Sequence, residues 1–170
     1  MPLEVAPKRR PRSTDASRAE ARAELIACAK AVAALATHRK IRPMRVHFVE
    51  HDREIRSVLE RVVRRWSQLV EVKYTTPAAA RAMRSETHIE HVVPIRLLVD
   101  RMIMQPRQIR RLLEDGVVLA RVTKREHQLL GGLYSHTPRL YGAMLRGPVE
   151  RLPAQGRHRY KRAGIRLERV

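Results

Sequence analysis

The segment THIEHVVPI, residues 87–95, has the pattern of a strand that ends beside a polar site. Two histidines and a glutamate that could bind a cation fall within four residues, and Val-Val-Pro-Ile follows directly. In an extended strand the adjacent Glu90 and His91 point to opposite faces. Both can act at one site only if the strand ends there and the chain turns, which the nearby Pro94 favours.

A second segment, VVLARVTKREHQLL at residues 117–130, supplies a matching half-site. Its first six residues have the composition of a buried strand. Thr123 and Glu126 then have the spacing of a capping box, which predicts that a helix begins here. His127 follows within the first turn of that helix. A strand, a long excursion, a strand and a helix can therefore bring this histidine to the acid–histidine pair of the first segment.

These side chains suit the hydrolysis of a phosphodiester bond. A hard divalent cation neutralises the charge that develops on the phosphate, and a base of near-neutral pKa deprotonates water. Glu90 can supply an anionic oxygen to the cation, and His91 can serve as the base. A further ligand must come from elsewhere in the chain, and His127 is the candidate.

The motif E-H-V-V-P-I followed by V-V-L-A-R-V-T-K-R-E-H-Q-L-L resembles the HNH endonucleases of the ββα-metal type. That family has an acid–histidine pair, two apolar residues and a proline at the end of its first strand. Its second strand leads into a helix that carries another metal-binding histidine. The resemblance spans residues 87–130 and implies Glu90 and His127 as metal ligands and His91 as the general base. It also implies Mg²⁺ or Mn²⁺ as the cofactor and DNA as the substrate.

The chain departs from the family pattern in three places. Many members carry C-x-x-C-H at the start of the helix, whereas residues 123–127 read TKREH and Cys28 is the single cysteine, so no structural zinc is expected. The family's asparagine is missing, because the sequence contains no Asn, and Asp115 lies loosely in the corresponding region. The two histidine-bearing halves are also 36 positions apart. His88, Asp115 and Glu126 are candidate accessory residues.

The charge of the chain predicts a polyanionic partner. Thirty-six Lys and Arg against seventeen Asp and Glu give a net charge of +19. Most of the cations are Arg, whose planar fork matches phosphate oxygens, so nucleic acid is the expected partner and double-stranded DNA the expected form. A solubilising coat, an acidic protein or a membrane surface are the alternatives. The residues predicted to contact phosphates are Lys8, Arg9, Arg10, Arg61, Arg64, Arg65, Arg157, Arg159, Lys161 and Arg162.

The remaining periodicities predict an α+β fold that is mostly helical, and the resemblance implies that it contains a ββα-metal (HNH-like) core of short antiparallel strands and a helix. Residues 1–14 are expected to be a basic disordered arm, 15–74 a helical N-terminal segment, and 75–170 the HNH-like domain with a basic C-terminal helix and strand. Short strands are predicted at 44–51 and 70–74. The helix predicted over 54–70 has an apolar face opposite Arg56, Arg61, Arg64 and Arg65, and this arginine face can either lie on phosphates or be solvated.

The sequence also predicts a cytoplasmic location. No apolar run approaches the ~20 residues of a membrane span. The first fourteen residues lack the apolar core of a signal peptide, and one cysteine is compatible with a reducing compartment.

A metal-dependent DNA endonuclease is the leading interpretation, and two others compete with it. A non-catalytic nucleic-acid-binding protein on a degenerate HNH scaffold predicts salt-sensitive binding without cutting. A helical scaffold that docks on an acidic protein uses its charge for association alone. This interpretation leaves residues 87–95 unexplained.

Overall fold

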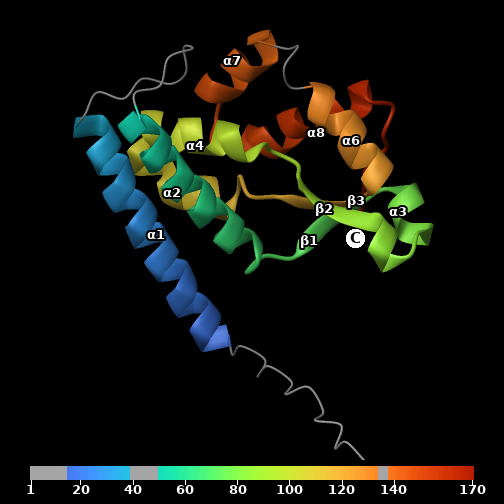
Figure 1. Ribbon diagram of the computed structural model, residues 1–170, viewed down its shortest axis with the longest axis horizontal. Coiled ribbons are helices and arrows are strands. Elements are labelled where there is room, and N and C mark those ends of the chain that lie inside the picture. The colour runs from blue at the N-terminus through green and yellow to red at the C-terminus, as the bar shows by residue number, and fades with distance from the viewer. Residues whose placement is uncertain (1–14, 39–49, 134–137) are drawn as a thin grey trace, which may run out of the picture.

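The computed structural model describes residues 15–38, 50–133 and 138–170, and it shows the predicted α+β fold, mostly helical with a small mixed sheet (Figure 1). The α-helices are α1 (Asp15–His38), α2 (Glu50–Ser67), α3 (Pro77–Arg81), α4 (Ile95–Met104), α5 (Ile109–Glu114), α6 (Lys124–Leu133), α7 (Pro138–Arg146) and α8 (Leu152–Arg162). The short 3-10 helices are η1 (Arg84–Glu86), η2 (Pro106–Gln108) and η3 (Val149–Arg151). The strands are β1 (Val72–Thr75), β2 (Thr87–His91), β3 (Leu119–Thr123) and β4 (Glu168–Arg169).

The described strands form one sheet in the order β2-β3-β1-β4. β2 and β3 are antiparallel, β1 runs parallel to β3, and β4 is antiparallel to β1. His88 lies opposite Val122 and Glu90 opposite Ala120, and because side chains alternate along a strand these four share one face. α6 follows β3 directly. The predicted order of strand, excursion, strand and helix is confirmed.

Two hydrophobic cores stabilise the molecule. The first lies among α1, α2, α4 and α5 and contains Trp66, Leu97 and Leu112. The second lies between the sheet and helices α6 and α8, and Tyr160 of α8 is buried in it. In Figure 1, α1, α2 and α4 gather on one side of the molecule, and the sheet with α6 and α8 on the other. The first core draws residues from both sides of position 74, so the predicted boundary there does not separate two packing units.

A buried polar network crosses the first core. Arg56 of α2 is 8% exposed and Asp100 of α4 is fully buried. The Nη1 group of Arg56 and the hydroxyl of Tyr141 on α7 each donate a hydrogen bond to the Asp100 carboxylate. The prediction that Arg56 lies on an exposed face is therefore wrong, because a buried carboxylate draws its guanidinium inward.

The capping box predicted at the start of α6 is confirmed. Glu126 Oε2 accepts a hydrogen bond from the backbone N–H of Thr123 at 2.8 Å, and the N–H of Glu126 donates to Thr123 Oγ1 at 3.2 Å. The helix continues through the pair Gly131-Gly132 to Leu133. Each glycine costs a helix only about 1 kcal/mol relative to alanine, so the pair does not by itself end the helix.

Some predictions fall outside the described residues. The basic arm with Lys8, Arg9 and Arg10 is one of them, and most of the predicted strand at 44–51 is another. α2 already begins at Glu50, so the last two residues of that predicted strand are helical. In the described ranges, none of the helices combines the length and the apolar character that crossing a membrane requires.

Candidate metal centre and basic surfaces

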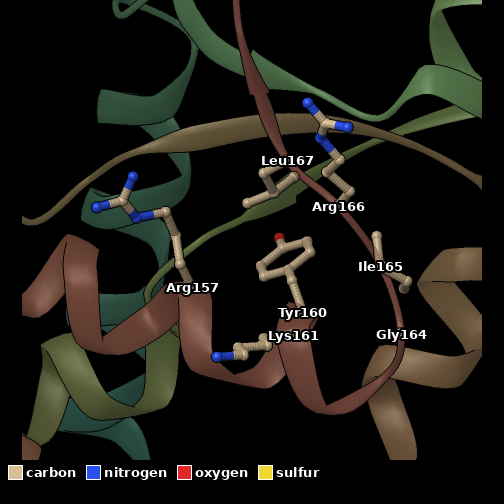
Figure 2. A pocket seen from close by; sticks show the side chains of 7 residues that line it. All are labelled: Arg157, Tyr160, Lys161, Gly164, Ile165, Arg166 and Leu167. Carbon is tan, nitrogen blue, oxygen red and sulfur yellow. The ribbon is translucent and has the colours of Figure 1, made fainter.

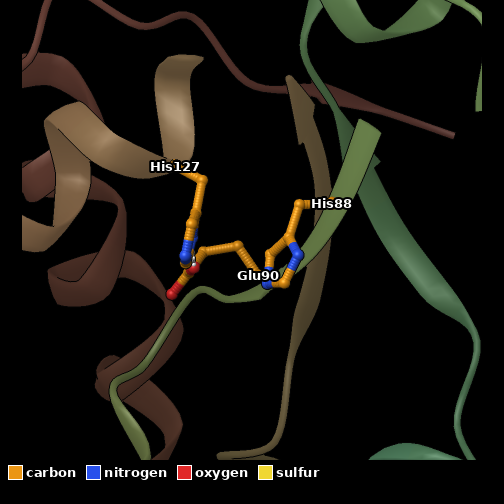
Figure 3. Close-up of side chains that lie close together, drawn as sticks. All are labelled: His88, Glu90 and His127. Atoms are coloured by element: carbon orange, nitrogen blue, oxygen red, sulfur yellow. Dashed lines mark hydrogen bonds and ion pairs between the residues drawn. The ribbon is translucent and has the colours of Figure 1, made fainter. Parts of the chain in front are cut away.

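His88, Glu90 and His127 form a compact group on one face of the sheet (Figure 3). His88 and Glu90 are two positions apart on β2, so they project from the same side of this edge strand. His127 is one turn into α6, which packs over β2. One potential ligand atom from each residue lies within 4.8 Å of the others, and the two imidazole rings are 4.1 Å apart. Such a group of nitrogens and a carboxylate can hold a divalent cation.

The Glu90 carboxylate is held from two sides. Its Oε2 is 2.5 Å from Nδ1 of His127, and its Oε1 accepts a hydrogen bond from Nη2 of Arg159 at 2.7 Å. Arg159 belongs to α8, and its Nη2 also donates to the carbonyl oxygen of His91. The carboxylate is 14% exposed and the Arg159 side chain 7%. Because Nδ1 of His127 and Oε2 of Glu90 face each other, a cation bound by both atoms would take the place of the proton between them.

Helix α8 reaches Glu90 because a glycine permits close packing. A Cβ on Gly156 would lie 2.5 Å from the carbonyl oxygen of Val92, which is the residue after the end of β2. The absence of a side chain therefore lets the α8 backbone approach the end of the strand. Arg159, three residues further along α8, then extends to the carboxylate.

His91 contacts a different part of the molecule. Its Nε2 is 2.6 Å from Oγ of Ser67, the last residue of α2. Ser67 donates its single hydroxyl proton to the carbonyl of Val63 at 2.7 Å, so its oxygen accepts from His91 and the proton of the imidazole resides on Nε2. Burial lowers the pKa of His91 from 6.5 to about 4, Glu90 opposes the change and Arg64 adds to it. The ring is therefore neutral near pH 7, with Nδ1 unprotonated.

The structure brings together some of the predicted site residues. Glu90 and His127 meet as expected, and His88 joins them as more than an accessory residue. His91 lies with Ser67, which agrees with the alternation of side chains along β2. The Glu126 carboxylate is used at the helix start, where it also accepts a hydrogen bond from Thr76 Oγ1 at 2.8 Å.

The last candidate accessory residue also lies apart from the group. Asp115 is exposed at the C-cap of α5 and does not belong to the group of potential ligands found among the described residues.

The predicted phosphate contacts divide into exposed and buried residues. Arg61, Arg64 and Arg65 are exposed on α2, and Arg157, Lys161 and Arg162 are exposed on α8. Arg159 was expected to be exposed as well, but it is 6% exposed and binds the Glu90 carboxylate. Its role beside Glu90 was missed, since no local pattern distinguishes this arginine from its neighbours in the basic C-terminal segment.

Comparisons with known proteins identify no relative: no family model, no curated protein and no solved structure matches the chain. The resemblance to HNH endonucleases thus rests on the motif in residues 87–130 and on the chemistry of the site itself.

Proposed function

We propose that this protein is a metal-dependent hydrolase of phosphodiester bonds in nucleic acid, related in design to the HNH endonucleases. The observation that carries this assignment is the meeting of Glu90 and His127, which are 37 residues apart in the sequence, beside His88 in a chain of net charge +19. The cation would be bound by one nitrogen of each histidine and a carboxylate oxygen of Glu90.

The donor set favours a transition-metal ion. Mg²⁺, expected from the resemblance, prefers oxygen ligands and keeps several waters, whereas imidazole suits Zn²⁺ and other first-row divalent ions. Two histidines and one glutamate also form the protein ligands of zinc in some hydrolases. A bound ion of this kind lowers the pKa of a coordinated water and stabilises charge developing on the phosphate. We therefore expect Zn²⁺ or Mn²⁺ to support activity better than Mg²⁺.

The basic surfaces agree with a nucleic-acid substrate, for which we propose double-stranded DNA. Exposed arginines lie on both α2 and α8, so two separate helices present cations to solvent. Contacts of this type bind backbone phosphates and position the duplex without reading its sequence. We propose that the protein acts on DNA in the cytoplasm, which is the location that the sequence predicts.

His91 is better suited to a structural role than to that of the general base. A base is most efficient when its pKa is near the working pH, and burial lowers the pKa of His91 to about 4. Its hydrogen bond with Ser67 instead ties the end of β2 to α2. We therefore expect His91→Gln to keep most of the cleavage activity, and complete loss of cleavage with unchanged DNA binding would restore the role implied by the resemblance.

Cleavage of supercoiled plasmid tests the assignment. The protein is first stripped with EDTA and then assayed with Zn²⁺, Mn²⁺ or Mg²⁺. His127→Ala should abolish metal-dependent nicking, while His158→Ala, which alters an exposed histidine on α8, should leave it unchanged. Cleavage that survives both EDTA and His127→Ala would contradict a metal centre at this site.

One observation favours the alternative of a non-catalytic nucleic-acid-binding protein. The Glu90 carboxylate already has a cationic partner in Arg159, 2.7 Å away, so its charge is compensated within the protein. In this case the group is a structural ion pair, the protein binds DNA, and no tested metal supports cleavage or raises the stability of the fold. Titration of the stripped protein with Zn²⁺ by calorimetry separates the two functions.

A further inference from the structure

A pocket of about 370 Å³ opens between α8 and the segment that leads into β4 (Figure 2). It is lined by Arg157, Tyr160, Lys161, Gly164, Ile165, Arg166 and Leu167. Figure 2 shows Arg157 and Arg166 on either side of the Tyr160 ring, with Lys161 on the neighbouring turn of the helix. None of the seven lining residues is acidic, so the pocket has a cationic rim around an apolar floor.

The end of α8 explains why the pocket exists. Gly164 has a φ of +69°, a left-handed conformation that glycine adopts without strain and that commonly ends a helix. Its N–H donates to the carbonyl of Lys161 at 3.1 Å, and the N–H of Ile165 donates to the carbonyl of Tyr160 at 2.8 Å. These two bonds turn the chain back along the helix. The returning segment faces the last turns of α8 and encloses the hollow.

The positive side chains are partly preorganised. The guanidinium of Arg157 lies 5.5 Å from the centre of the Tyr74 ring on β1, a cation–π contact that restricts its position. Lys161 is exposed to solvent, and no acidic residue lines the pocket beside it. Arg166 has an acidic neighbour in Glu168, but their contact of 3.5 Å is solvent-exposed, and such pairs contribute little. All three can therefore turn their charge toward a bound anion.

The floor of the pocket is connected to the candidate metal centre. The hydroxyl of Tyr160 accepts a hydrogen bond from Nη2 of Arg159 at 3.3 Å, and the same group donates to Glu90 at 2.7 Å. Tyr160, Ala120 and Val122 belong to the second core, so the pocket lies on the side of the sheet that carries Glu90. One nucleic-acid strand can therefore contact both sites.

We propose that this pocket is a phosphate subsite, which binds a backbone phosphodiester of the nucleic acid some distance from the phosphate that is cleaved. The subsite rests on the proposed function and adds to it a path for the strand, from the β2–α6 group across α8 to β4. Arg157, Lys161 and Arg166 neutralise the phosphate. Tyr160 supports the floor and, through Arg159, keeps the subsite in a constant position relative to Glu90.

Salt-dependent DNA binding tests the subsite without any need for cleavage. Fluorescence anisotropy with a labelled duplex is measured in EDTA over a range of salt concentrations. The pocket variant is Arg157→Gln, Lys161→Gln, Arg166→Gln. The matched control is Lys30→Gln, Arg107→Gln, Arg110→Gln, which removes three exposed cations on α1, η2 and α5. Circular dichroism and thermal melting verify that both are folded, and the single variant Lys161→Gln serves as a milder test.

When one phosphate contact is lost, the plot of log K against log salt becomes less steep by about 0.9, which corresponds to about eightfold weaker binding at 0.1 M salt. We expect this change in the pocket variant and a smaller one in the control. Equal losses in the two triple variants, or none in either, would overturn the subsite. The inference would also be overturned if the protein binds inorganic phosphate tightly in this pocket while the pocket variants keep their DNA affinity. In that case the pocket is a site for free phosphate.

The result is distinguishable from a failure of the proposed function. A protein that shows the pocket-specific change but never cuts DNA contradicts hydrolysis and leaves the subsite in place. A protein that cuts DNA but binds it equally well without the three cations contradicts the subsite alone.

Discussion

Glu90→Gln is the substitution that separates a metal centre from a structural ion pair. Glutamine has the shape of glutamate without its charge, so the Arg159 guanidinium, 6% exposed, loses its anionic partner. Removal of one member of a buried ion pair costs about 3–5 kcal/mol. Glu90 retains some access to solvent, since its side chain is 14% exposed, and we therefore expect a loss of about 3 kcal/mol in EDTA. Typical folding stabilities of about 5–15 kcal/mol leave such a variant folded.

The metal adds a second effect. A cation present at 100 times its dissociation constant stabilises the folded protein by about 2.7 kcal/mol. Loss of even an outer-shell partner of a metal lowers affinity about 10–100-fold. At the same metal concentration, Glu90→Gln should therefore gain only about 1.4 to 0.4 kcal/mol from the cation.

Urea denaturation followed by far-UV circular dichroism measures both effects, with and without Zn²⁺. Glu114→Gln is the matched control, because its pair with Arg110 is exposed and contributes less than about 1 kcal/mol. A double-mutant cycle with Arg159→Met isolates the coupling between the two partners. The reasoning is refuted if Glu90→Gln loses no more stability than Glu114→Gln, or if Zn²⁺ stabilises Glu90→Gln as much as the unchanged protein.

Three further outcomes follow from the packing and the buried imidazole. The pKa of His91 is about 4 in the folded state against 6.5 in the unfolded chain, so below pH 6.5 the unfolded state binds more protons and the folded state loses stability. This loss should reach about 3 kcal/mol near pH 4. His91→Gln should remove this part of the pH dependence of the urea midpoint. Gly156→Ala places a Cβ 2.5 Å from the Val92 carbonyl and should cost about 1–3 kcal/mol in thermal melts. Gly131→Ala meets nothing within 4 Å on α6 and should instead add about 0.5–1 kcal/mol; a loss of stability there would contradict the description of this helix.

The parts of the site that local patterns encode were predictable. Strand alternation placed Glu90 and His91 on opposite faces, and the capping box at Thr123 placed His127 at the start of a helix. Glu90 and His127 meet because β2 pairs antiparallel with β3, a pairing that the resemblance to HNH endonucleases implied. These predictions depend on residues that are close in sequence or belong to one motif.

The contributions from distant segments were not predictable. Arg159 reaches Glu90 from 69 residues away, and neither its spacing nor its neighbours indicate this contact. Arg56 was assigned to an exposed face because charge periodicity describes a helix in isolation, whereas Asp100 on another helix decides its burial. The partner of His91, Ser67, likewise comes from α2, whose packing against α4 brings it near the strand end. Tertiary contacts of single polar residues leave no periodic signal.

The excursion between β2 and β3 has a kinetic consequence for any bound cation. His88 and Glu90 are close in sequence, but His127 is 37 residues from Glu90, so an unfolded chain does not hold all three ligands together. Long-range pairing of this type forms slowly, since the loop must close before its contacts form. If the ligands assemble only after the folding barrier is crossed, metal will slow the unfolding rate and leave the refolding rate almost unchanged.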